Sequence, residues 1–173
     1  EDAREVIFDS LGHEGAKAYD ACWHPAIKSD FFRFVEMYER GGLYVDADEM
    51  IRDKNTDYFE SCTKDAHFFL YSNKLSSSIH SSILYAKPKM KVFQTCVEVS
   101  LQNIQRLNGK KESPMGVAGP GVLFDALVKT YGIKDAYNVT SSGEFESNSQ
   151  CATSYPAEYR KDNRSWQKAM GWQ

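Results

Sequence analysis

The spacing of apolar and polar residues between residues 29 and 40 predicts an amphipathic helix. Apolar side chains recur there every three or four residues, which is the spacing of one helix face. Ser29 is a residue type that caps helix N-termini, and Gly41 is the residue type that most often ends a helix. The apolar positions are Phe31, Phe34, Val35 and Tyr38.

The pattern then changes to strict alternation over residues 43–48, which predicts a strand. Alternate residues of a strand point to opposite faces. One face would carry Leu43, Val45 and Ala47, and the other would carry Tyr44, Asp46 and Asp48. The sequence therefore predicts a strand with an acidic end, following a helix and a pair of glycines.

Further elements follow along the chain. Residues 14–22 predict a short helix that the His24-Pro25 step would end, and residues 67–72 and 78–86 predict two strands. A long amphipathic helix is expected over 88–107 with Pro88 at its first position, and a glycine turn feeds another helix that closes at Gly132. Strands alternating with helices predict one α/β domain over residues 1–173, with a mostly parallel sheet covered by helices on both faces.

Composition narrows the class of protein. The chain has 173 residues, of which 42% are hydrophobic and 13% aromatic, and this favours an ordered globular domain. The net charge is only −3 and no basic stripe is present, so we expect no nucleic-acid partner. No apolar run is long enough for a transmembrane segment. The first residues read as the middle of a helix without an initiator Met, so an N-terminally truncated fragment is expected.

The sequence does not decide the cellular compartment of the protein. The four cysteines lie far apart without CxxC spacing, and two Asn-x-Ser/Thr triplets, at Asn138 and Asn163, would matter only in a secretory lumen. A cytoplasmic or membrane-peripheral location is the expectation, with the Golgi lumen as the alternative.

The acidic strand end can be interpreted as a metal site or as a solvated turn. On an extended chain Asp46 and Asp48 would point the same way, roughly 7 Å apart, where two carboxylates repel unless solvent, donors or a hard cation such as Mg²⁺ or Mn²⁺ separates them. From spacing alone a solvated surface turn is equally open. A calcium-binding EF-hand loop is excluded, because Ile51 stands where it needs Gly and Asp57 where it needs Glu.

The preceding helix adds a carboxylate and a guanidinium. Asp30 and Arg33 lie three residues apart and share a helix face, with Arg40 on the same side. Alone, the first two residues would be an ordinary surface ion pair. Since a helix usually packs beside the strand that it feeds, both groups could meet at the acidic strand end, where they would suit sugar hydroxyls.

The segment "KSDFFRFVEMYERGGLYVDADE" resembles the signature of the sugar-nucleotide-dependent glycosyltransferases with a DXD motif. That group contains yeast-type mannosyltransferases, capsular polysaccharide transferases and, more distantly, the large clostridial glucosylating toxins. Looser matches are "SIHSSILYAKPKMKVF", "AGPGVLFDAL" and the late "DNRSW". The matching signature residues are Ser29, Asp30, Arg33, Gly41, Gly42, Tyr44, Asp46 and Asp48.

The resemblance implies a GT-A-like fold that lacks its N-terminal strand here, and transfer of a sugar from a UDP- or GDP-sugar to a glycan or other hydroxyl acceptor with retention of configuration. It implies that Asp48 binds Mn²⁺ or Mg²⁺, with Asp162 and Ser165 as late metal-side residues. Catalytic roles fall to Asp30, Arg33, Asp46 and Asp48. The donor-binding residues that it implies are Ser29, Asp30, Arg33, Tyr44 and Asp46.

Two other functions stay open. A haloacid-dehalogenase-type phosphohydrolase also places Asp-x-Asp at a strand end, with the first Asp as nucleophile, although Met50 stands where that family has Thr or Val. A catalytically silent module that binds sugars or nucleotides is the other alternative. Metal-dependent donor binding with turnover separates the transferase from both.

Overall fold

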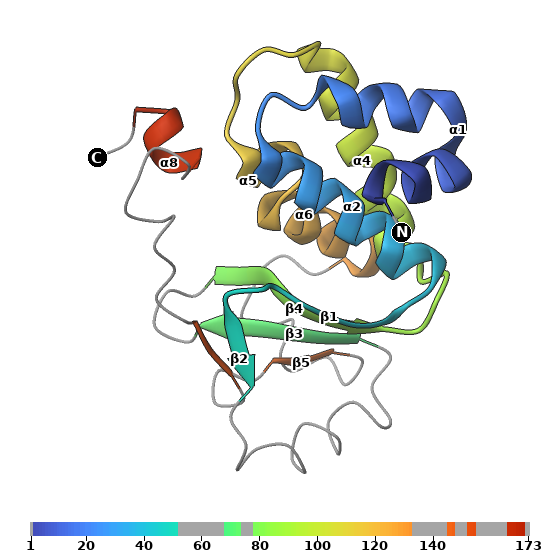
Figure 1. Cartoon of the computed structure of the whole chain (residues 1–173). Helices are drawn as coiled ribbons and strands as arrows, with labels where there is room; N and C mark the ends of the chain where they lie inside the picture. Colours follow the sequence, from blue (N-terminus) through green and yellow to red (C-terminus); the bar gives the residue numbers. More distant parts are fainter. Residues whose placement is uncertain are drawn as a thin grey trace.

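A computed structural model describes residues 2–51, 68–73, 78–132, 145–147, 152–154 and 166–171. Helices gather on one side of a small sheet in this part of the chain (Figure 1). The elements are α1 (Ala3–Ala21), α2 (Pro25–Glu39), β1 (Gly42–Val45), β2 (Glu49–Ile51), β3 (Phe68–Asn73), β4 (Ser78–Ala86), α4 (Lys91–Leu107), α5 (Pro114–Val117), α6 (Pro120–Tyr131), β5 (Phe145–Ser147), β6 (Ala152–Ser154) and α8 (Trp166–Ala169).

The described strands form a larger sheet of mixed direction and a separate two-stranded sheet. In the larger sheet the strand order is β1-β4-β3-β5, and β2 pairs with β6 in a separate antiparallel pair. Strand β4 runs antiparallel to both β1 and β3, and among the described strands only β3 and β5 pair in parallel. The mixed helix and strand class is confirmed, but for the described strands the expectation of a mostly parallel sheet is wrong.

The short connection between β3 and β4 explains that error. Only residues 74–77 separate the two strands. A parallel pair needs a crossover connection of about a dozen residues or more, whereas an antiparallel pair can be joined by a short turn. Neighbouring strands this close in sequence therefore pair as a hairpin.

The core lies between the sheet and the helical layer. Phe31 and Phe34 from α2, Phe93 from α4, Leu123 from α6 and Leu84 from β4 are all fully buried there. The apolar face predicted for the helix over residues 29–40 is thus confirmed. This packing fixes the polar face of α2 relative to the strands.

Several helix boundaries differ from the predicted ones. Helix α2 begins at Pro25, because the His24 imidazole Nδ1 accepts the backbone N–H of Ala26 at 3.1 Å and caps the helix. Ser29 therefore lies inside the helix and is not its cap. Helix α4 begins at Lys91 and not at Pro88, since Lys89 has a left-handed backbone with φ of 62°.

The N-terminal helical segment is longer than predicted. Helix α1 spans Ala3–Ala21 with a break at Gly12, where φ is 66° and ψ is −159°. Within the described ranges, none of the helices has both the length and the apolar character that crossing a bilayer requires.

Candidate functional site

The Gly-Gly joint between α2 and β1 places the helix against the sheet. Gly41 has a φ of +63°, and a Cβ atom there would come within 2.6 Å of both the Ala86 carbonyl oxygen and the Pro88 nitrogen. This left-handed backbone favours glycine, and only glycine also permits the close approach. The joint thereby seats the last turns of α2 beside β1 and β4, with Arg33 above the strand ends.

Arg33 is the centre of the site. Its side chain is buried, with only 5% of the residue exposed. Guanidinium Nη1 donates to the Ser81 carbonyl and to Ser81 Oγ, both at 2.6 Å. The other terminal nitrogen, Nη2, lies 2.9 Å from Asp46 Oδ1 and 3.2 Å from Asp30 Oδ1. One cation therefore joins the carboxylates of α2 and of the strand end, as the sequence predicts.

Tyr44 completes the contact with Asp46. Its hydroxyl donates to Asp46 Oδ1 at 2.8 Å, and its ring lies 4.7 Å from the Arg33 guanidinium carbon in a cation–π contact. Burial raises the pKa of the Tyr44 hydroxyl to about 12, opposed by Arg33 and by hydrogen bonding to Ser29. Tyr44 is thus a neutral donor that orients the Asp46 carboxylate.

Asp30 is buried and close to the start of α6. Burial raises the pKa of its carboxyl to about 7, the nearby Arg33 charge lowers it, and the Asp46 charge raises it further. A Cβ atom added to Gly119 would lie 3.0 Å from Asp30 Oδ2. Glycine at position 119 therefore leaves the space that the carboxyl occupies.

The two aspartates of the motif sit on a tight turn and not on a straight strand. Strand β1 ends at Val45, the Asp46 N–H bonds to the Ser82 carbonyl at 2.8 Å, and the Glu49 N–H bonds back to the Asp46 carbonyl at 2.9 Å. The expected extended geometry over residues 43–48 is therefore wrong at its end. Asp48 lies half-buried in this turn, directly before β2.

Other predicted residues contribute differently. Ser29 is exposed on α2 and reaches the cluster through Tyr44. Arg40 pairs with Glu36 at 3.3 Å on the exposed part of the helix. Asp162 and Ser165 lie outside the described residues. Among the residues that the structure describes, no group of three or more His, Cys, Asp or Glu side chains is arranged to hold a metal ion.

Sequence reasoning missed two contributors. Ser81 lies in the segment that predicts a strand over residues 78–86, and no motif marks its side chain. Its actual contact is with Arg33 through main chain and side chain. Gly119 belongs to the turn in "AGPG", and nothing in its own segment indicates a neighbour on α2. Both contacts join elements that are far apart in sequence.

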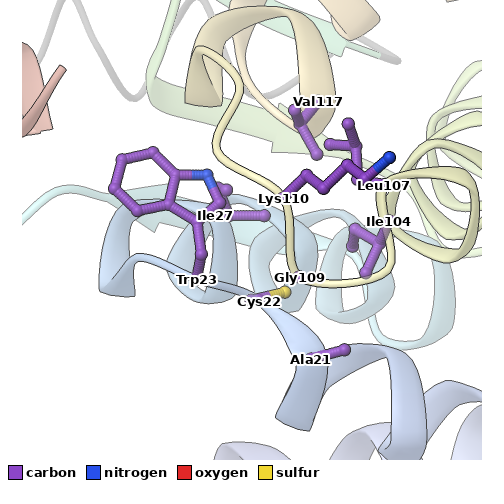
Figure 2. Close-up of a pocket in the computed structure, with 9 residues that line it drawn as sticks. All are labelled: Ala21, Cys22, Trp23, Ile27, Ile104, Leu107, Gly109, Lys110 and Val117. Carbon is purple, nitrogen blue, oxygen red and sulfur yellow. The ribbon is translucent and has the colours of Figure 1, made fainter.

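A separate hollow lies within the helical layer (Figure 2). It contains about 180 Å³ of empty space, part of which is open solvent, and its lining shares no residue with the Arg33 cluster. Cys22, Trp23, Ile27, Ile104 and Val117 are among the side chains around it. The Trp23 indole N–H donates to the Glu112 carbonyl at 3.1 Å and closes one side.

Comparison with known proteins identifies the region that holds the cluster. Residues 5–63 match the family described as glycosyltransferase sugar-binding region containing DXD motif. No curated protein sequence matches the chain.

A solved structure named "PaToxG Glycosyltransferase" resembles the chain with 13% sequence identity and a TM-score of 0.50. The match covers 99% of this chain and 50% of that one, so the chain spans about half the length of this relative. At this identity the likeness shows a shared fold. Together with the match over residues 5–63, it confirms the resemblance seen in the sequence: residues 5–63 are similar to the sugar-binding region of the glycosyltransferases with a DXD motif.

Proposed function

We propose that this protein is a metal-dependent, retaining glycosyltransferase of GT-A-like fold that moves a sugar from a nucleoside diphosphate sugar to a hydroxyl acceptor such as a glycan. The observation that carries the proposal is the buried Arg33, which joins Asp30 to Asp46 beside the DXD turn. The family match over residues 5–63 supports the same reading.

The cluster has the chemistry that binds a polyol. Sugar hydroxyls need acceptors and donors held in fixed directions, and charge-assisted hydrogen bonds supply both orientation and affinity. Asp30 and Asp46 offer carboxyl oxygens, and Arg33 and Tyr44 hold these oxygens in place. The site therefore enters the complex already ordered, and little side-chain entropy is lost when the donor sugar binds.

The described donor set fits a hard cation that is bound together with the substrate. Mg²⁺ is commonly held by one or two carboxylates plus substrate phosphates, without a complete protein cage. We assign the metal to Asp48, as the resemblance of the motif implies, while Asp46 Oδ1 holds the contacts with Arg33 and Tyr44. When bound, the ion would neutralise charge on the departing diphosphate.

The same contacts count against a phosphohydrolase. In that mechanism the first Asp of the motif attacks phosphorus and needs an accessible, basic carboxylate. Asp46 Oδ1 instead accepts hydrogen bonds from both Arg33 and the Tyr44 hydroxyl, which stabilise its charge and reduce its reactivity.

Donor titration tests the proposal. Labelled UDP- and GDP-sugars are titrated with and without Mn²⁺ against the parent protein, Asp48→Asn and the control Asp125→Asn, whose side chain is exposed on α6. We expect metal-dependent donor binding with slow release of free sugar in the parent and in the control. Asp48→Asn should weaken the metal-dependent binding by at least about tenfold, with the fold unchanged by circular dichroism.

Three outcomes contradict parts of this reading. Equal donor and metal binding by Asp48→Asn would remove Asp48 from the metal site. Phosphate release from simple monoesters would favour the phosphohydrolase. Donor binding without turnover in the full-length protein would point to a silent binding module.

A further inference from the structure

We propose that Ser81 is a positioning residue of the sugar-nucleotide site, because its hydroxyl fixes the Arg33 guanidinium in the orientation that bridges Asp30 and Asp46. The inference rests on the proposed function and deepens it. Ser81 would touch neither the donor nor the metal, and would act only through Arg33.

The geometry of the guanidinium gives Ser81 this control. The group is planar, so fixing the direction of one terminal nitrogen fixes the direction of the other. Ser81 accepts from Nη1 twice, through its carbonyl and its Oγ, both at 2.6 Å. Nη2 then lies within 3.2 Å of an oxygen of each carboxylate.

The Nε atom of Arg33 does not help to hold the guanidinium within the described part of the chain. Its Nε is buried and has no hydrogen-bond partner among the described residues. Nothing on that nitrogen resists rotation of the group about the end of the side chain. The orientation is therefore held at the terminal nitrogens, by Ser81 on Nη1 and by the two carboxylates on Nη2, and the Ser81 hydroxyl is one of the two acceptors of Nη1.

An irregularity in β4 aims Ser81 at the helix. Leu84 pairs with Leu70 of β3, but Ile79 pairs with Ser72, so the register shifts between these pairs. In a regular strand Ile79 and Leu84, five residues apart, would point to opposite faces. Both belong to the same core cluster, and Ser81, two residues from Ile79, shares its face. Bulges of this kind often re-aim a side chain beside a functional site.

The neighbouring Ser82 offers a matched control. Its main-chain carbonyl pairs with the Asp46 N–H, a contact that alanine would keep. Its own Oγ has no hydrogen-bond partner among the described residues. Ser82→Ala thus removes the same atom from the next position of the same strand and leaves Arg33 untouched.

The experiment compares the full-length parent with Ser81→Ala, Ser81→Thr, Ser81→Cys and Ser82→Ala. Donor affinity and the separate values of kcat and KM are measured, and the ¹⁵N signals of the Arg33 side chain report the orientation of the guanidinium without any substrate. We expect Ser81→Ala to weaken donor binding about tenfold, since a hydrogen bond to a charged group is lost. Its Arg33 Nη signals should merge through faster rotation.

The conservative variants define the role of the hydroxyl. Ser81→Thr keeps the acceptor and should restore donor affinity to within about threefold of the parent, with separate Arg33 signals. Ser81→Cys keeps the shape but accepts hydrogen bonds weakly, so it should resemble Ser81→Ala. If Ser81→Ala does not fold, Ser81→Cys supplies the comparison.

The readouts separate failure of this inference from failure of the proposed function. Unchanged Arg33 signals and unchanged donor affinity in both Ser81→Ala and Ser81→Cys would overturn the positioning role. Equal losses in Ser82→Ala would do the same, because they would show a general effect on the strand. If the parent binds no sugar nucleotide at all, the proposed function fails, and with it the role of Ser81 in a donor site, even if the Arg33 signals show that Ser81 fixes the guanidinium.

Discussion

Arg33 faces two carboxylates, Asp30 and Asp46, with a single positive charge. Its Nη2 is shared between them, and the Tyr44 hydroxyl adds a second donor to Asp46 alone. Asp46 therefore has two donors on one oxygen, while burial raises the pKa of the Asp30 carboxyl, so that Asp30 keeps its proton to higher pH than an ordinary carboxyl. The pattern Asp30-x-x-Arg33 predicted the contact between these two residues, but not the unequal sharing, because that depends on burial.

This inequality predicts a pH-dependent effect of Asp30→Asn. The pKa of Asp30 is about 7 in the fold against an ordinary value of 3.8, so the folded state binds more protons than the unfolded chain between these pH values. The stabilising effect of the neutral carboxyl is complete below about pH 4 and is lost as pH rises through about 7. Asp30→Asn should therefore be more stable than the parent at pH 8 and equal to it near pH 4.

Urea unfolding of both proteins at pH 4, 6 and 8 measures the difference. Asp125→Asn, at an exposed position on α6, serves as the control and should track the parent throughout. A gap between Asp30→Asn and the parent that stays constant with pH would show that Asp30 titrates near its ordinary value.

The helix and strand boundaries show what the sequence pattern can predict. The apolar face of α2, its end before Gly41 and the start of β1 were all readable, because each depends on residues that are neighbours along the chain. The cap by His24 was missed, since an imidazole can replace the usual Ser, Thr, Asp or Asn. The turn at Asp46 was missed because its hydrogen bond to Ser82 comes from another strand.

Gly119 lies at the start of α6, close to Asp30 of α2, and we expect this position not to tolerate alanine. An alanine there would bring its Cβ to 2.9 Å from Met115 Cα and to 3.0 Å from Asp30 Oδ2. The backbone of the short helix α5 cannot yield as easily as a side chain, so we expect Gly119→Ala to destabilise the fold by about 1–3 kcal/mol. It should also weaken donor binding by displacing Asp30.

Gly116→Ala is the matched control for this change. Gly116 lies on α5, the helix that an alanine at position 119 would press against. A Cβ atom at Gly116 would meet nothing within 4 Å. We expect its free energy of unfolding to equal or slightly exceed that of the parent. Similar losses in the two variants, by urea unfolding, would mean that chain entropy and not the contact with Asp30 decides the result.

At the scale of the whole molecule, strand direction was the main error. Alternating helices and strands suggested parallel pairing, but residues 74–77 are too few for a crossover between β3 and β4. In the helical layer α2, α4, α6 and the second half of α1 were predicted, and α5 was not. The position of the layer against one face of the sheet depends on contacts that no local pattern records (Figure 1). The joint at Gly41 is one such contact.

The two glycines of that joint should differ in their tolerance of substitution. Both have left-handed backbones, which cost an ordinary residue about 1–2 kcal/mol. Gly42→Ala should cost only this amount, since open space surrounds its Cβ position. Gly41→Ala adds clashes with the backbone of residues 86–88, so we expect a markedly larger loss and a displaced α2.

Thermal unfolding of the two alanine variants, with circular dichroism of the folded forms, measures this difference. Equal losses at the two positions would show that the backbone conformation alone matters. In that case the close approach of α2 to the end of β4 would not hold the layers in register.

The register shift in β4 has a consequence for changes in chain length. Because the irregularity lies between Ile79 and Leu84, the number of residues in that interval decides which side chains face the helices. Substitutions there alter one side chain at a time. An insertion or deletion of a single residue would turn either the core residues or Ser81 to the other face of the sheet. Relatives that keep this site should therefore vary in residue type within the interval but not in its length.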